Sequence, residues 1–164
     1  MPHRLRTVDL DFLEKAPHRF VFEATVAAPQ KAVFGAISAD PSTWTWWPGH
    51  DEGRYESPEP HGVGSRRHMR MGESWYRETI LAWDEPTRWA YRVDESADAL
   101  LNALVEEWVV EGEGDGEQST VRWTFAVDPG PDFEAAIAGV KTMIGNMFDE
   151  AMANLGARLA GARG

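Results

Sequence analysis

Apolar and polar residues alternate through much of the chain between residues 20 and 128, and this pattern predicts β-strands. The predicted strands cover residues 20–26, 54–57, 65–71, 74–83, 88–95, 104–111 and 120–128. Pro29 begins a short predicted helix that runs to Ile37, and residues 42–47 are expected to form another helical turn before Pro48. The pattern therefore predicts one strand, a short helical region and then a run of strands.

After residue 130 the apolar positions change to helical spacing. Asp132, behind Pro131, is a suitable N-cap, so a single helix is predicted from Asp132 toward Gly161. Its apolar stripe consists of Phe133, Ile137, Val140, Ile144, Met147, Phe148, Ala151 and Leu155. No titratable side chain enters the stripe before Arg158. We expect this helix to cover the sheet without contributing an acid, a base or a nucleophile.

A two-residue turn at Gly72-Glu73 determines which side chains share a face of the sheet, because glycine suits the first position of such a turn. The turn pairs Met71 with Ser74, Met69 with Tyr76, and Arg67 with Glu78. A four-residue loop at 84–87 then pairs Trp83 with Arg88, Ala82 with Trp89, Ile80 with Tyr91, and Glu78 with Val93. Further along, Trp108 shares a face with Val110, and Val121, Trp123, Phe125 and Val127 form another apolar stripe. One face of the sheet is therefore expected to be apolar, with an arginine–carboxylate pair within it.

Composition narrows the class of protein. The 164 residues suit a single domain with a substantial core. Cysteine is absent, which excludes disulfides and makes a cytoplasmic location the default expectation. The formal charge of -11 argues against nucleic acid as a partner, since phosphate binding requires clustered Lys and Arg. No stretch approaches the ~20 apolar residues of a membrane-spanning helix, so we expect no integral membrane segment.

Several short segments carry a family resemblance. They are residues 26–34 (VAAPQKAVF), 44–48 (WTWWP), 62–67 (GVGSRR), 77–78 (RE), 83–86 (WDEP) and 105–108 (VEEW). With the order of elements, they resemble the START-like (Bet v 1-like) superfamily and, within it, the SRPBCC group of polyketide cyclase/dehydratase and lipid-transport proteins. The resemblance implies an α+β helix-grip fold, in which a curved antiparallel sheet wraps around a long C-terminal helix and two short helices follow the first strand.

The same resemblance sets the expected domain and the expected ligand. Residues 1–164 are expected to form a single START-like domain, with a core at about 18–160 and an N-terminal extension at 1–17. A cavity between sheet and helix is implied for hydrophobic ligands such as lipids, sterols or polyketides. We expect no cofactor. The candidate ligand-binding residues are Arg67, Met69, Tyr76, Glu78, Ile80, Trp89, Tyr91, Trp108, Trp123 and Phe125 on the strands, and Ile137, Val140, Ile144, Met147 and Phe148 on the helix.

Arg67 and Glu78 are the sharpest candidates for chemistry. In one interpretation they orient a polar group of a ligand, or act with Tyr76 as proton donors and acceptors in an enzyme. In the other, which we favour because geometry alone supports it, they form an ordinary cross-strand salt bridge, which contributes little to stability where it is exposed. Burial would separate the two, because desolvation raises the proton affinity of a carboxylate.

The other polar candidates are weaker. Glu106 shares the parity of Trp108 but stands near the predicted start of a strand, where we expect it to face solvent. Tyr76 and Tyr91 are expected to be core aromatics with satisfied hydroxyls, and His68 is expected on the outer face opposite Arg77. None of the five histidines has the spacing of a metal site, so we expect no metal.

Trp44, Trp46 and Trp47 allow three interpretations: a lid over the cavity, docking of the short helices against the sheet, or a subunit contact in a homodimer. Docking is the one we favour. For the protein as a whole, the first hypothesis is a binding protein for a small hydrophobic molecule. A polyketide aromatase/cyclase-type enzyme is the alternative, and a protein-interaction module is a further one. The lack of a compelling base favours binding, and whether the protein is an enzyme stays open.

Overall fold

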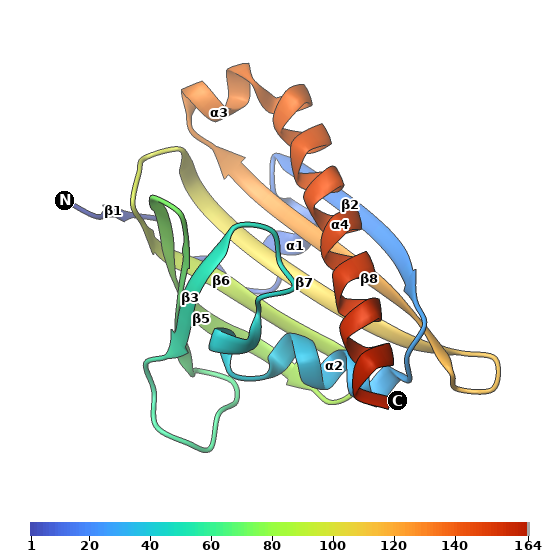
Figure 1. Ribbon diagram of the computed structural model, residues 1–164. Helices are drawn as coiled ribbons and strands as arrows, with labels where there is room; N and C mark the ends of the chain where they lie inside the picture. Colours follow the sequence, from blue (N-terminus) through green and yellow to red (C-terminus); the bar gives the residue numbers. More distant parts are fainter. Residues whose placement is uncertain (164) are drawn as a thin grey trace.

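A long C-terminal helix lies across one face of a curved antiparallel sheet in the computed structural model, which describes residues 1–163 (Figure 1). The elements in chain order are β1 (His3–Arg4), α1 (Phe12–Lys15), β2 (His18–Val26), α2 (Gln30–Ser38), the 3-10 helix η1 (Pro41–Thr43), β3 (His50–Tyr55), β4 (Arg66–Met71), β5 (Ser74–Asp84), β6 (Arg88–Ser96), β7 (Leu101–Glu113), β8 (Gln118–Pro129), α3 (Pro131–Ala135) and α4 (Ile137–Arg163). The strands follow the order β2-β8-β7-β6-β5-β4-β3, and β1 pairs with the end of β6. This arrangement confirms the predicted helix-grip fold.

The register of the hairpin between β4 and β5 is as predicted. Met71 pairs with Ser74, Met69 with Tyr76, and Arg67 with Glu78. Gly72 has a φ of 64°, the left-handed region that the tight turn requires and that glycine adopts without strain. A local turn signal was therefore sufficient to place the arginine opposite the carboxylate.

The predicted register of the hairpin between β5 and β6 is wrong near the loop. Trp83 pairs with Trp89 and Ala82 with Ala90, because β5 runs one residue further and Asp84 pairs with Arg88. A register shift between Ile80 and Ala82 then restores two predicted pairs further from the loop, Ile80 with Tyr91 and Glu78 with Val93. The inward face of β5 is thus as expected, while the loop is one residue shorter.

The predicted single helix from Asp132 is two helices. Gly130 is the N-cap of α3, because Pro131 already occupies the first turn, and Asp132 makes no capping bond. The chain leaves helical geometry at Ala136 (φ -105°, ψ 11°) and α4 then begins at Ile137. Figure 1 shows the two helices running in different directions at one end of the sheet. The helical turn expected at 42–47 is likewise shorter, since only η1 is helical there.

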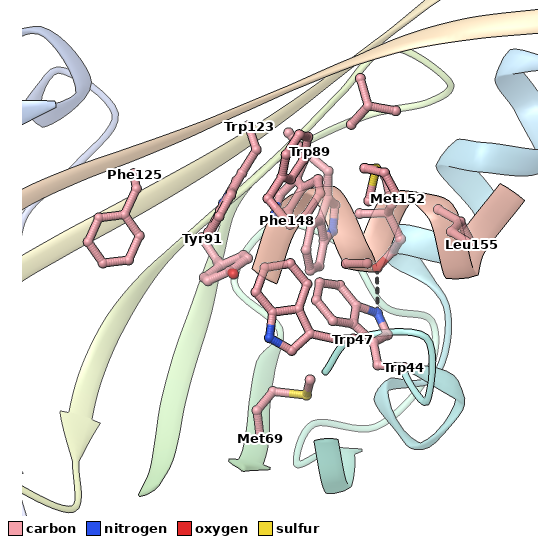
Figure 2. Close-up of a cluster of buried hydrophobic side chains, with 14 of the residues drawn as sticks. Trp44, Trp47, Met69, Trp89, Tyr91, Trp123, Phe125, Phe148, Met152 and Leu155 are labelled. Atoms are coloured by element: carbon pink, nitrogen blue, oxygen red, sulfur yellow. Dashed lines mark hydrogen bonds between the residues drawn. The ribbon is translucent and has the colours of Figure 1, made fainter. Parts of the chain in front are cut away.

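Side chains pack on both faces of the sheet. On the face under α4 lies an aromatic core whose tryptophans and phenylalanines contact one another (Figure 2). On the opposite face, Phe12 and Leu13 of α1 are buried against Ala103, Val105 and Ala126 of β7 and β8. The N-terminal segment expected as an extension therefore covers the outer face of the sheet and buries apolar surface there.

Candidate functional site

A cavity of about 320 Å³ lies between the sheet and the helices α3 and α4. Its wall consists mainly of rings, aliphatic side chains and methionines: Trp44, Trp47, Met69, Met71, Tyr76, Tyr91, Leu100, Leu101, Leu104, Trp108, Trp123, Phe125, Phe133, Val140, Met143, Ile144 and Met147. The polar side chains on the wall are Arg67, Ser74, Glu78, Ser96, Asp98 and Glu106. Leu100 and Met143 are 42% and 55% exposed, so the cavity meets solvent between the β6–β7 loop and α4. The volume is at the small end of the range of about 300–1,000 Å³ that is typical of small-molecule pockets.

Most of the predicted contact residues lie on this wall. They are Arg67, Met69, Tyr76, Glu78, Tyr91, Trp108, Trp123, Phe125, Val140, Ile144 and Met147. Ile80, Trp89, Ile137 and Phe148 do not line the cavity. Ile80, Trp89 and Phe148 also face the interior, but they are completely buried in the aromatic core. Ile137 follows the break at Ala136, which interrupts the single helical stripe on which its prediction rested.

Arg67 and Glu78 form a buried ion pair on the cavity wall. The Nε atom of Arg67 donates to Oε2 of Glu78 across 2.6 Å, and the two side chains are only 1% and 5% exposed. The predicted cross-strand ion pair is therefore present, but it is buried rather than exposed. A pair out of contact with water requires good geometry and further contacts to offset its desolvation.

Three aromatic rings supply those further contacts. The guanidinium carbon Cζ lies 4.7 Å from the ring centroids of Trp44 and Trp89 and 4.8 Å from that of Tyr91. Such contacts stabilise a desolvated cation through the negative ring faces. The Nη1 atom of Arg67 is buried and has no hydrogen-bond acceptor among residues 1–163. The guanidinium is thus held by one carboxylate and by the rings that surround it.

Glu106 lies in a buried environment, whereas the sequence pattern predicted that it faces solvent. It is 9% exposed, lines the cavity, and accepts a hydrogen bond of 3.0 Å from the indole Nε1 of Trp123. The hydroxyl of Tyr91 lies within hydrogen-bonding reach of the same carboxyl group. The expectation that Glu106 faces solvent is wrong because β7 begins at Leu101, which leaves Glu106 well inside the strand.

Burial dominates the proton affinity of these groups. Desolvation, together with the nearby charge of Glu78, raises the pKa of Glu106 to about 8. Desolvation also raises the pKa of Glu78, although Arg67 offsets part of this effect. For Arg67, burial opposes the charge, but the Glu78 carboxylate keeps the pKa above its usual value. The wall therefore holds one ionic pair and, beside it, a carboxyl group that keeps its proton near neutral pH.

The two tyrosines on the cavity wall, Tyr76 and Tyr91, differ in how deeply they are buried. Tyr91 is 3% exposed, and burial raises the pKa of its hydroxyl well above the usual value, with the charges of Glu106 and Glu78 adding to the effect. Tyr76 is partly buried, and desolvation likewise raises the pKa of its hydroxyl. Both hydroxyls therefore stay protonated at neutral pH and act as hydrogen-bond donors.

Trp44, Trp46 and Trp47 belong to the core. They are 2%, 3% and 7% exposed, and Trp44 packs 4.5 Å from Trp46 between ring centroids. The indole of Trp44 donates to the carbonyl of Ile37 across 2.9 Å, the dashed line in Figure 2. Asn154 of α4 donates to the carbonyl of Trp46 across 3.1 Å. Trp44 also packs against Trp89 and Trp108 of the sheet, so the docking interpretation is confirmed. The three rings are buried and form no exposed subunit contact, while Trp44 and Trp47 contribute to the cavity wall from within the core.

Residues 17–160 match the family described as polyketide cyclase/dehydrase and lipid transport. The chain belongs to this family. Uncharacterized relatives in Mycobacterium tuberculosis and Mycobacterium bovis are 31% identical to it over 121 residues, which cover 73% of this chain and 71% of theirs.

Solved structures support the fold of this family member. A START superfamily protein from Mycobacterium smegmatis superposes with a TM-score of 0.70 at 12% identity, covering 88% of this chain and 99% of the other. The ZhuI aromatase/cyclase from Streptomyces sp. R1128 gives a TM-score of 0.67 at 15% identity, with 87% and 93% covered. At this level of identity the likeness establishes the START-like architecture alone.

Some wall residues of this family member were not found from its sequence. Glu106, Trp47, Leu104 and Met143 line the cavity but were not among the predicted contact residues. Two signals had pointed to them: the parity of Glu106 with Trp108, and the interpretation of Trp47 as part of a lid over the cavity. Within the described residues, no group of three or more His, Asp or Glu side chains is placed to hold a metal ion. No helix in residues 1–163 combines the length and the apolar character needed to cross a membrane.

Proposed function

We propose that the protein binds one small hydrophobic molecule in the cavity between the sheet and α4. The observation that carries this proposal is the hollow of about 320 Å³ within an otherwise dense aromatic core. Protein interiors normally pack as densely as organic crystals. The side chains that line a cavity of this size therefore lack dispersion contacts, which a bound ligand would supply. The family description, which includes lipid transport, agrees with this role.

The wall suggests how such a guest would be oriented. Its apolar body would contact the rings of Trp108, Trp123 and Phe125 from the sheet and the aliphatic side chains of α4. The polar side chains of the wall come from the strands and, for Asp98, from the β6–β7 loop, while the helix contributes no titratable side chain to the wall. A ligand with one polar end and an apolar body matches this division.

Binding can be tested with the neutral fluorescent probe N-phenyl-1-naphthylamine. We expect a saturable rise in probe fluorescence with the wild-type protein. Val140→Trp places an indole in the cavity and should weaken binding at least tenfold. Ala138→Trp adds the same ring to the exposed face of the same helix and should bind as wild type does. Equal binding by the two variants, with both shown to be folded by circular dichroism, would refute binding in this cavity.

A second function, acid–base catalysis on a carbonyl compound, is favoured by two carboxyl groups on one wall, of which Glu78 is paired with Arg67 and Glu106 is not paired with a cation. Glu78, ionised beside Arg67, would accept a proton from the carbon next to the carbonyl. Glu106, protonated, would donate one to the carbonyl oxygen. Of the catalytic candidates, Arg67 would then orient Glu78, and Tyr76 would be a further donor. Deuterium exchange of the methyl protons of 2-acetylnaphthalene, followed by NMR in D₂O, tests this: exchange no faster than in buffer excludes the chemistry for that compound.

A further inference from the structure

Glu78 and Glu106 lie on a cavity wall that has one cation, Arg67, and only Glu78 is paired with it. The guanidinium of Arg67 already donates from Nε to Glu78 across 2.6 Å. Glu106 forms no ion pair with any Lys, Arg or His among residues 1–163, and its contacts are the indole of Trp123 and the phenol of Tyr91. A carboxylate in such surroundings is costly unless it is paired, so it takes up a proton instead.

The groups that face Glu106 from each packed element strengthen this assignment. They are Arg67 on β4, Tyr76 and Glu78 on β5, Tyr91 on β6 and Trp123 on β8. Asp98, from the β6–β7 loop, lines the same cavity, and the wall residues of α3 and α4 are all apolar. Acidic groups therefore outnumber cations on the cavity wall. The pKa of Glu106 is raised to about 8, first by desolvation and then by the charge of Glu78.

Arg67 is poorly placed to receive an anionic ligand. Its free Nη1 is buried, and its guanidinium lies among the rings of Trp44, Trp89 and Tyr91 at 4.7–4.8 Å. A ligand carboxylate would have to displace a ring or the Glu78 carboxylate to reach it. An anion in the cavity would also add a negative charge to a wall that already carries Glu78 and Asp98, in a medium that screens charges poorly.

We propose that Glu106, as a neutral carboxylic acid, donates a hydrogen bond to the carbonyl oxygen of an uncharged ligand, and that the cavity excludes carboxylates of the same shape. This inference rests on the proposed binding function and specifies the chemical class of the ligand. A buried O–H donor whose partner is missing carries a desolvation cost, which a ketone, ester, amide or quinone oxygen removes and a hydrocarbon does not. Glu106 is here a binding and specificity residue.

Three naphthalenes of nearly equal shape test the inference by isothermal titration calorimetry: 2-acetylnaphthalene, 2-isopropenylnaphthalene and 2-naphthoate. At pH 6.5 the ketone should bind about tenfold more tightly than the hydrocarbon, the effect expected of one buried hydrogen bond. The naphthoate should bind more weakly than both. At pH 9.5, above the pKa of about 8, Glu106 is ionised and the preference for the ketone should disappear.

Three variants distinguish the effect of the hydrogen-bond donor at position 106 from the effect of a negative charge. Glu106→Gln keeps an N–H donor and should retain the preference for the ketone at both pH values. Glu106→Leu has no donor and should bind ketone and hydrocarbon equally. Glu111→Gln, an exposed position on the outer face of the same strand, removes one negative charge away from the cavity and should behave as wild type.

The outcomes distinguish this inference from the proposed function. Hydrocarbon binding without a preference for the ketone, or a preference that survives in Glu106→Leu, overturns the role of Glu106 and leaves binding intact. Naphthoate binding as tight as that of the ketone at pH 6.5 overturns the exclusion of carboxylates. If none of the three compounds binds, the proposed function fails, and the inference fails with it.

Discussion

Replacing Glu106 by Gln should make the protein relatively more stable as the pH rises. The substitution preserves the shape of the side chain and an oxygen that can accept from Trp123 Nε1, the 3.0 Å contact of the wild type. It removes the one group on the cavity wall whose pKa is raised to about 8. The comparison therefore isolates the cost of burying this carboxyl group.

The magnitude follows from the two states of Glu106. In the unfolded chain its carboxyl group ionises at its ordinary pKa of 4.5, whereas in the folded protein it keeps its proton until about pH 8. Because the folded state binds this proton more tightly, its contribution to stability is complete below pH 4.5 and is lost as the pH rises toward 8. The loss is about 1.4 kcal/mol per pH unit, or about 5 kcal/mol over the whole interval. Because Gln does not titrate, the variant loses no stability from this position as the pH rises.

The assay is urea denaturation of wild type and Glu106→Gln at pH 5, 7 and 9. We expect the difference in free energy of unfolding to move in favour of the variant by several kcal/mol between pH 5 and pH 9. Glu111→Gln serves as the control, since that side chain is exposed on the opposite face. A difference that stays constant from pH 5 to pH 9 would show that Glu106 ionises normally in the folded protein, and the reasoning would be refuted.

Three further predictions concern packing and can be measured by urea denaturation at pH 7. Arg67→Met leaves Glu78 buried without its cation and should cost about 3–5 kcal/mol, so a loss below about 1 kcal/mol contradicts the buried pair. Phe12→Ala removes a buried ring from the outer face and should cost about 3–4 kcal/mol, whereas an unchanged stability would show that α1 does not hold to the sheet. Gly139→Ala should raise the free energy of unfolding by about 1 kcal/mol through helix propensity, because a Cβ at this position meets nothing within 4 Å. Gly145→Ala should lack this gain, because its Cβ would lie 3.0 Å from a ring carbon of Phe22 on β2. Equal gains in the two variants would contradict the close contact at Gly145.

The sequence was informative where the structure is decided locally. The turn at Gly72 specifies the β4–β5 register by itself, so it placed Arg67 opposite Glu78 without knowledge of the rest of the fold. The alternation along β8 similarly identified the buried positions Val121, Trp123 and Phe125. Side-chain parity in a strand follows from the backbone, and a tight turn fixes it for the adjoining strand as well.

Depth within the core was not predictable from the same patterns. Parity shows which face a side chain occupies, but Ile80 and Trp89 on that face are completely buried in the core, while Tyr91 reaches the cavity. For Trp89 the burial depends on where residues 44–47 pack, because Trp44 lies against its ring, and that segment is placed by contacts with α2 and α4. The break at Ala136 had no strong signal either, because alanine is compatible with a continuous helix.

Glu106 shows why the chemistry of the cavity was harder to identify than its walls. Its parity pointed inward, but its expected position near the start of a strand favoured solvent, and a lone carboxylate is rarely buried. The structure buries it because Trp123 on β8 and Tyr91 on β6 offer polar contacts from both neighbouring strands. Those partners are 17 and 15 residues away in the chain, and their side chains had each been assigned to an apolar face. A buried acid of this kind is therefore identified only when register and depth are known together, since the polar atoms that accommodate it belong to residues that the hydrophobic pattern counts as core.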